Sequence, residues 1–234
     1  MEPMLRIEAL GKTFTLHQLG KRIAACERID MTIAAGEFIG ITGRSGSGKS
    51  TILKLIYRSY LPQRGAVWYR SARFGLLDLF LASERQVMYL RKHEIGYVSQ
   101  FLNLVPRTTA REALEHAALE MGMTRGQARE EAERMLRHFE LGEELWDSYA
   151  STFSGGEKLR LNVARAMVKH PRLLLLDEPT ASLDEHSKGR VRELLEKLKA
   201  EGTTILGIFH DLQFMDGLCD REYSMSLGSF REKG

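Results

Sequence analysis

The residues Gly43 to Thr51 read GRSGSGKST and fit the phosphate-binding pattern G-x-x-x-x-G-K-[ST]. They follow EFIGITG, an apolar stretch typical of a strand, and open STILKLIYRSY, which has the one-sided apolar spacing of a packed helix. Glycines let backbone N–H groups wrap an anion, and the N-terminus of a helix adds the positive end of its dipole. Lys49 would place a positive charge on the β- and γ-phosphates of a nucleotide, and Ser50 would offer a hydroxyl to Mg²⁺. A chance Lys-Ser pair in a glycine-rich turn is the alternative, and the flanking strand and helix favour the phosphate site.

Two acidic residues, Asp177 and Glu178, end the apolar run LLLLDE. The C-terminal edge of a parallel sheet is where α/β proteins bind ligands. There Asp177 suits the outer shell of a Mg²⁺ ion, and Glu178 is placed to orient an attacking water and accept its proton. Acidic residues after a strand often form only a solvated turn, but beside a phosphate loop they predict hydrolysis of a nucleoside triphosphate. The sequence lacks the guanine-binding pattern N-K-x-D, which favours ATP.

The stretch FSGGE, Phe153 to Glu157, precedes the amphipathic pattern KLRLNVARAMVKH. Ser154 and Glu157 fit a capping box, in which each side chain satisfies a backbone N–H of the first helical turn. Capping does not explain Gly155 and Gly156, because a glycine inside a helix costs about 1 kcal/mol relative to alanine. Bare N–H groups at a helix start form an anion site that a Cβ atom would obstruct. The glycines therefore predict that a ligand or partner closely approaches this helix end.

The order of predicted elements gives these motifs their positions. Residues 4–37 predict short strands broken by turns, whereas LLLLDE and TTILGIFHD predict buried strands separated by the helical EHSKGRVRELLEKLKAEG. From about Thr108 to Leu141 the pattern is helical, and one apolar face carries Ala128, Ala132, Met135, Leu136 and Phe139. This order predicts a doubly wound α/β sheet with a helical insertion near residues 100–155. The span after Gly65 stays open between a strand pair followed by a helix and a mostly helical segment.

Length and composition restrict the class of protein. A chain of 234 residues suits one sizeable α/β domain, and no repeat suggests a tandem pair. A net charge of +3 is too small to argue for nucleic acid or membrane binding. Cys26 and Cys219 lie far apart and show no metal-ligand spacing, which fits a reducing compartment. With no membrane-length apolar run and no signal-peptide pattern, we expect a cytoplasmic protein with no nucleic-acid partner.

Taken together, the motifs resemble those of the ATP-binding-cassette (ABC) ATPases over nearly the whole chain. The matching phrases, in order, are GRSGSGKST, IGYVSQ ending at Gln100, FSGGE, LLLLDE, ASLD at 181–184 and IFHD containing His210. The resemblance implies a single P-loop domain over residues 1–234 with a RecA-like core sheet and an N-terminal antiparallel β subdomain. It also implies an inserted α-helical subdomain at about 101–165 that carries the signature motif FSGGE. In that family the signature of one cassette clamps ATP held by the phosphate loop of another.

The resemblance also implies roles for individual residues. Glu178 and His210 would be catalytic, and Ser50, Gln100 and Asp177 would serve Mg²⁺. Glu157 departs from the family, where glutamine is commoner, and we expect it to cap the helix more than to contact nucleotide. Contacts with ATP are implied for Phe14, Gly43, Arg44, Ser45, Gly46, Ser47, Gly48, Lys49, Ser50, Thr51, Gln100, Ser154, Gly155, Gly156, Glu157 and Asp184. Among these, Phe14 would stack on adenine, although core packing is the alternative for its ring.

Longer phrases, including GYVSQFLNLVPR and STFSGGEKLRLNVARA, resemble the second ATP-binding subunit of the bacterial carbon–phosphorus lyase system. That resemblance implies a cytoplasmic subunit that works with the lyase core complex in phosphonate degradation, near the step that forms a ribose-1-phosphonate triphosphate. Its partner cassette would be a second copy or a sister subunit. The same phrases overlap lipoprotein-release and macrolide-export cassettes. The alternative is therefore the motor subunit of a membrane transporter, with a permease as its partner.

Overall fold

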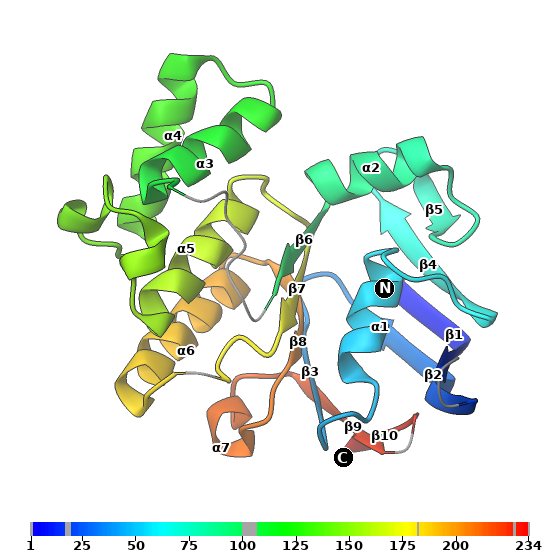
Figure 1. The fold of residues 1–234 in the computed structure, drawn as a ribbon. Helices are drawn as coiled ribbons and strands as arrows, with labels where there is room; N and C mark the ends of the chain where they lie inside the picture. Colours follow the sequence, from blue (N-terminus) through cyan, green and yellow to red (C-terminus); the bar gives the residue numbers. More distant parts are fainter. Residues whose placement is uncertain (1, 17–19, 100–106, 182, 227, 234) are drawn as a thin grey trace.

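The computed structural model describes residues 2–16, 20–99, 107–181, 183–226 and 228–233, and it places their strands in one mixed sheet (Figure 1). The ten-stranded sheet has the order β5-β4-β1-β2-β10-β9-β3-β8-β7-β6. The strands are β1 Leu5–Leu16, β2 Lys21–Ile33, β3 Phe38–Gly43, β4 Arg64–Ser71, β5 Gly75–Asp78, β6 Ile95–Val98, β7 Leu173–Asp177, β8 Thr204–Ile208, β9 Arg221–Ser226 and β10 Ser229–Lys233. The helices are α1 Lys49–Ile56, α2 Glu84–His93, α3 Ala110–Glu120, α4 Arg125–His138, α5 Gly155–Met167, α6 Glu185–Ala200 and α7 Leu212–Met215, with 3₁₀ turns at Glu143–Leu145 and Ala150–Thr152.

The core of the sheet is parallel. β3 pairs in parallel with β8 and β9, and β7 pairs in parallel with β8 and β6. All five residues of β7 and of β8 are buried, because helices or the antiparallel strands cover both faces. Side chains alternate between two apolar clusters, so that Leu174 and Leu176 pack toward α5 and α6, and Leu173 and Leu175 pack toward α1. The predicted α/β sheet is confirmed.

The N-terminal strands form an antiparallel region. β1 pairs with β2 and β4, and β4 pairs with β5. The span after Gly65 is thus a strand pair followed by a helix, the first of the two alternatives. Ser83 is the N-cap residue of the helix in this span: its side chain and that of Gln86 form a capping box at the start of α2.

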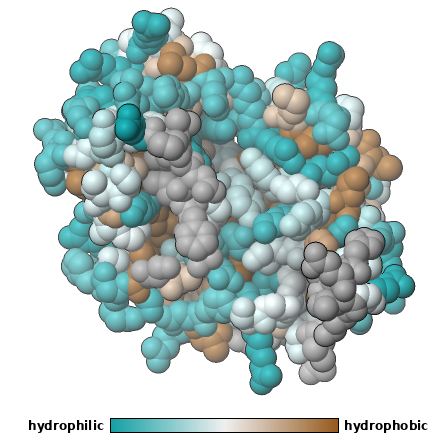
Figure 2. Space-filling view, viewed as in Figure 1, coloured by the Kyte–Doolittle hydropathy of each residue, from teal (hydrophilic) through white to brown (hydrophobic). Residues whose placement is uncertain are grey.

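The helices α3, α4 and α5 lie between β6 and β7 in the sequence and form the left part of Figure 1 together with α6. Capping boxes start α3 at Thr109 and α4 at Thr124. The predicted apolar face is confirmed, because its five residues are all buried, Phe139 among them. The surface is hydrophilic over much of this part, and it is hollowed between α3 and the part that carries α2 (Figure 2).

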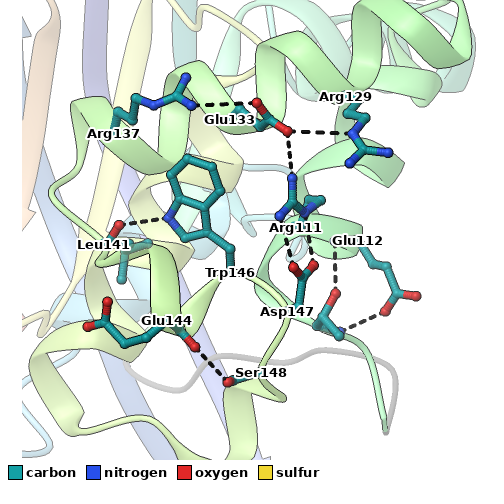
Figure 3. Close-up of polar contacts among 11 residues, drawn as sticks. Arg111, Glu112, Arg129, Glu133, Arg137, Leu141, Glu144, Trp146, Asp147 and Ser148 are labelled. Carbon is teal, nitrogen blue, oxygen red and sulfur yellow. Dashed lines mark hydrogen bonds and ion pairs between the residues drawn. The ribbon is translucent and has the colours of Figure 1, made fainter.

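A network of charged side chains fixes the segment that leads to α5 (Figure 3). The guanidinium of Arg111 donates two hydrogen bonds of 2.9 Å to Asp147 and one of 2.6 Å to Glu133. This pairing holds the pKa of Asp147 below its usual range. The Arg111 and Arg137 guanidiniums also lie 5.3 and 4.9 Å from the ring of Trp146. The approach to the FSGGE helix is therefore held against α3 and α4.

Among the helices of the described residues, none is both long and apolar enough to cross a lipid bilayer.

Candidate functional site

The stretch Gly43–Thr51 turns from the end of β3 into the start of α1, as its pattern predicts. Gly48 precedes the helix with φ +102°, and a Cβ atom there would collide with the carbonyl oxygen of Ala25. Gly43 has φ +144°, and a Cβ there would collide with the carbonyl oxygen of Met225. Both positions therefore require glycine. No side chain caps α1 at this end, which leaves the positive end of the helix dipole facing the loop.

Lys49 lies inside this loop and is only 3% exposed. Its ammonium donates hydrogen bonds to the carbonyl oxygens of Gly43, at 2.8 Å, and Arg44, at 3.0 Å. Burial lowers the pKa of Lys49, and the nearby carboxylates of Glu178 and Asp177 oppose that shift. The hydroxyl oxygen of Ser47 is buried and has no hydrogen-bond partner among the described residues. A buried cation and an unsatisfied hydroxyl in a glycine-rich loop fit a polyanionic phosphate chain.

Ser50 and Asp177, far apart in the sequence, meet in the structure. The Ser50 hydroxyl donates a 2.7 Å hydrogen bond to Asp177 Oδ1. The Tyr97 hydroxyl donates a 2.6 Å hydrogen bond to Asp177 Oδ2. A hydroxyl and a carboxylate beside a phosphate loop form the oxygen donor set that Mg²⁺ takes in nucleotide sites, where phosphates and waters supply the other ligands. These residues fit that ion.

Glu178 and His210 form a second pair at the same edge of the sheet. Asp177 and Ile208 are register partners in β7 and β8, so the residues that follow each strand leave the sheet together. Glu178 has φ +53°, a conformation that costs a residue with a side chain roughly 1–3 kcal/mol and that clusters at functional sites. Its Oε1 lies 2.7 Å from His210 Nε2. A cavity of about 560 Å³ opens onto both side chains.

Sequence reasoning missed Lys188, which lines the same cavity. Its ammonium donates hydrogen bonds to Asp211, at 2.8 Å, and to Glu185, at 2.7 Å. The Lys188 contact lowers the pKa of Asp211. It ties the start of α6 to the residue after His210. An i, i+3 Glu-Lys pair gives no hint of this contact, because it depends on how α6 meets the end of β8.

The FSGGE stretch begins α5 as predicted. Ser154 and Glu157 form the capping box: the Ser154 backbone N–H donates to the Glu157 carboxylate at 2.8 Å, and the Ser154 hydroxyl accepts from the Glu157 backbone N–H at 3.3 Å. Gly155 is exposed at the helix start, whereas Gly156 is buried. A Cβ atom on Gly156 would lie 3.0 Å from Ser187 Oγ and 3.1 Å from Ser187 Cβ. Close packing against α6 is thus a reason for the second glycine that sequence analysis did not find.

The remaining predicted residues lie as follows. Asp184 caps α6, with its Oδ1 accepting a 2.8 Å hydrogen bond from the Ser187 backbone N–H. The ring of Phe14, on β1, is partly exposed and makes an edge contact with Tyr60, with centroids 5.4 Å apart. Arg44 and Ser45 lie in the phosphate loop, and Thr51 lies in α1. Gln100 falls outside the described residues.

Two further residues connect these parts. Asn162, on α5, donates a 3.1 Å hydrogen bond to the carbonyl oxygen of Ser99, which directly precedes Gln100. Tyr97, on β6, carries the hydroxyl that contacts Asp177. Neither was singled out from the sequence, because both contacts depend on the placement of β6 beside β7 and α5.

Comparisons with known proteins agree with this geometry. A family model described as ABC transporter matches residues 26–181. The chain is 35% identical over 230 residues to the lipoprotein-releasing system ATP-binding protein LolD of Xanthomonas oryzae pv. oryzae, covering 98% of this chain and 91% of that protein. It is 34% identical over 208 residues to the macrolide export ATP-binding/permease protein MacB of Brucella abortus, covering 89% of this chain and 31% of that protein. The chain therefore spans less than a third of that exporter.

Solved structures show the same fold. The structure of the ATP-binding cassette MJ0796, in a dimeric post-hydrolysis state with ADP and Pi, has a TM-score of 0.88 and 29% identity over 98% of both chains. The structure of cbiO1 from Clostridium perfringens, part of the ABC transporter complex cbiONQ, has a TM-score of 0.84 and 27% identity. The match covers 99% of this chain and 88% of that one.

Proposed function

The chain belongs to the ABC transporter family of ATPases, and we propose that it is the ATP-hydrolysing subunit of a membrane transporter that works as a pair of cassettes. The observation that carries this proposal is the convergence of a buried lysine, a Ser–Asp pair and a Glu–His pair at one edge of a parallel sheet. These are the groups that bind a triphosphate, hold its metal ion and activate water. We further propose that residues 1–234 form a single cassette with its helical subdomain at about 101–165.

The phosphate chain of ATP would lie along the backbone of Gly43–Thr51, with the Lys49 ammonium on its β- and γ-phosphates. Its hydrogen bonds to Gly43 and Arg44 already hold that ammonium within the loop. Mg²⁺ would be held by Ser50, with Asp177 and Gln100 around it, and would supply charge neutralisation at the phosphates. Phe14 would stack on the adenine.

Glu178 would orient and deprotonate the attacking water, and His210 would hold the Glu178 carboxylate through the 2.7 Å contact. Lys188 would support this pair from α6, because it fixes Asp211 next to His210.

The N-terminus of α5 would face the nucleotide of the partner cassette. Its capping box orders the turn, and the exposed Gly155 leaves backbone N–H groups open to an anion. Ser154, Gly156, Glu157 and Asp184 would complete the contact with the partner. The dimer reported for the related cassette MJ0796, bound to ADP and Pi, supports this pairing.

The relatives favour a permease over the carbon–phosphorus lyase core as the further partner. LolD and MacB are named for lipoprotein release and macrolide export, and the resemblance to a phosphonate-degradation subunit gains no support from them. We propose that the chain docks on the cytoplasmic face of its membrane, where ATP is available.

Affinity purification separates these partners. The tagged chain, expressed in its own host and purified from detergent-solubilised membranes, is expected to retain a protein with several membrane spans. Its ATPase activity is expected to rise with that protein present. Recovery of only water-soluble subunits, with no membrane-spanning protein bound, would argue for the lyase assignment instead.

Replacing Lys49 by alanine is expected to weaken Mg-ATP binding well over tenfold, a loss of at least about 1.4 kcal/mol, because a buried charge-assisted contact is lost. Calorimetric titration of the full chain measures this loss. Lys54→Ala is the matched control, because Lys54 lies on the same helix but points over the ring of Tyr60, 5.8 Å from its centroid. Equal affinities for the two variants would contradict the phosphate assignment.

A further inference from the structure

We propose that Tyr97 is a positioning residue, whose hydroxyl holds the Asp177 carboxylate in the orientation that serves the Mg²⁺ of bound ATP. This inference rests on the proposed function, because it assumes that Asp177 belongs to the metal site. It assigns a role to a residue that none of the sequence motifs singled out.

Both oxygens of the Asp177 carboxylate are engaged, each by a different hydroxyl. Oδ1 accepts from Ser50 at 2.7 Å, and Oδ2 accepts from Tyr97 at 2.6 Å. In the described part of the chain, Tyr97 is the only side chain that donates to Oδ2. Two donors on opposite oxygens fix the plane of the carboxylate, so Tyr97 and Ser50 together hold the rotation of the group about its Cβ–Cγ bond. Hydrogen bonds from a hydroxyl to a carboxylate are short and roughly twice as strong as neutral ones.

The strand register brings the two side chains together. Tyr97 of β6 is the register partner of Leu175 in β7, and Asp177 follows Leu175 by two residues. Side chains alternate along a strand, so Tyr97, Leu175 and Asp177 project from the same face of the sheet. The start of α1, which carries Ser50, packs on that face. No loop movement is needed for the contact.

The ring of Tyr97 packs against a second tyrosine, Tyr57. Its centroid lies 5.0 Å from that of Tyr57, and the Arg91 guanidinium lies 4.8 Å from the Tyr57 ring. Arg91 also donates a 2.9 Å hydrogen bond to the Tyr57 carbonyl oxygen. Tyr97, Tyr57 and Arg91 line a cleft of about 370 Å³. Asn162 and Arg165, both on α5, also line this cleft. Tyr97 therefore extends from this cleft to the carboxylate and can transmit the position of its ring to Asp177.

The test separates metal binding from nucleotide binding. Calorimetric titrations of the full chain with a non-hydrolysable ATP analogue, in EDTA and in saturating Mg²⁺, give two dissociation constants whose ratio measures the gain in affinity due to the metal. Tyr97→Phe keeps the ring and removes only the hydroxyl. Outer-shell groups of a metal site are typically worth about 10–100-fold in metal affinity, and Tyr97 acts through such a group, Asp177. This ratio is therefore expected to fall about tenfold while the metal-free dissociation constant is unchanged.

Two variants complete the design. Tyr57 lines the same cleft, and among the described residues its hydroxyl donates no hydrogen bond to Asp177. Tyr57→Phe is therefore expected to change neither constant. Asp177→Asn is expected to remove most of the metal-dependent gain in affinity.

The outcomes distinguish the two proposals. If Tyr97→Phe keeps the wild-type gain in affinity with Mg²⁺ and Asp177→Asn loses it, the role of Tyr97 is overturned and the proposed function stands. A full gain in Asp177→Asn would instead overturn the metal site itself, and equal weakening of both constants in Tyr97→Phe would reduce Tyr97 to a general packing role.

Discussion

Replacing Glu178 with glutamine is expected to leave Mg-ATP binding intact and to slow ATP hydrolysis by about 10²–10⁴-fold, the usual contribution of a general base. Glutamine keeps the size of the side chain and can still hydrogen-bond to His210, which lies 2.7 Å from the Glu178 carboxylate. It cannot accept a proton from water at neutral pH. The effect therefore falls on turnover and not on affinity.

The measurement pairs calorimetry for binding with phosphate release for turnover, and it is made with the partner cassette or permease present, because the proposed function places part of the hydrolytic site on a partner cassette. Glu196→Gln is the matched control. Glu196 is an exposed acid on α6 that pairs with Arg192 at 3.0 Å, and its loss is expected to change neither quantity. Hydrolysis by Glu178→Gln at the rate of the control would remove Glu178 from the mechanism.

Much of this site was predictable because it depends on local signals. The phosphate loop was predicted to lie between a strand and a helix, and it does, because glycines at positive φ and a helix start are encoded in neighbouring residues. The buried runs that end at Asp177 and His210 were predicted as parallel strands from apolar content alone, and their shared edge follows from the parallel pairing of β7 and β8. The capping box of α5 was likewise a short-range pattern.

Contacts between elements that lie far apart in the chain could not be predicted from the sequence. The hydrogen bond from Tyr97 to Asp177 requires the register of β6 against β7, which no motif specifies. The contact of Lys188 with Asp211 requires the approach of α6 to the end of β8. The secondary structure of the span 65–91 was ambiguous because its apolar residues belong to two short strands, a turn and a helix that follow one another closely. Within this span, the helix cap at Ser83 is the one local signal that marks where the helix begins.

The two glycines of FSGGE differ in a way that decides how the partner contact is tested. Gly156 is buried, and even the Cβ of alanine would come within 3.0 Å of Ser187 Oγ, tighter than ordinary van der Waals contact. A defect in any Gly156 variant would therefore mix poorer packing of α5 on α6 with loss of a nucleotide contact. Gly155, by contrast, is exposed at the first position of α5.

Gly155→Asp is accordingly expected to keep its fold and its own ATP binding but to lose ATP-driven pairing and hydrolysis. An acidic residue in the first helical turn interacts favourably with the helix dipole, so unfolding measurements should show no loss of stability. Opposite the γ-phosphate of a partner's ATP, the same charge is repelled. Like charges placed together across an interface cost several kcal/mol, so the association constant should fall about 100-fold or more.

The matched control makes the same substitution at another helix start. Gly126 lies in the first turn of α4, is exposed, and has nothing within 4 Å of the place where a Cβ would be. Gly126→Asp adds the same charge to the same helical part of the chain, and it is expected to pair and hydrolyse ATP as the wild type does. Sedimentation with and without Mg-ATP, in the Glu178→Gln background that prevents turnover, compares the two variants directly. If Gly155→Asp pairs as well as Gly126→Asp, no phosphate of a partner approaches this helix end, and the packing of Gly156 against Ser187 is the only role left for the FSGGE glycines.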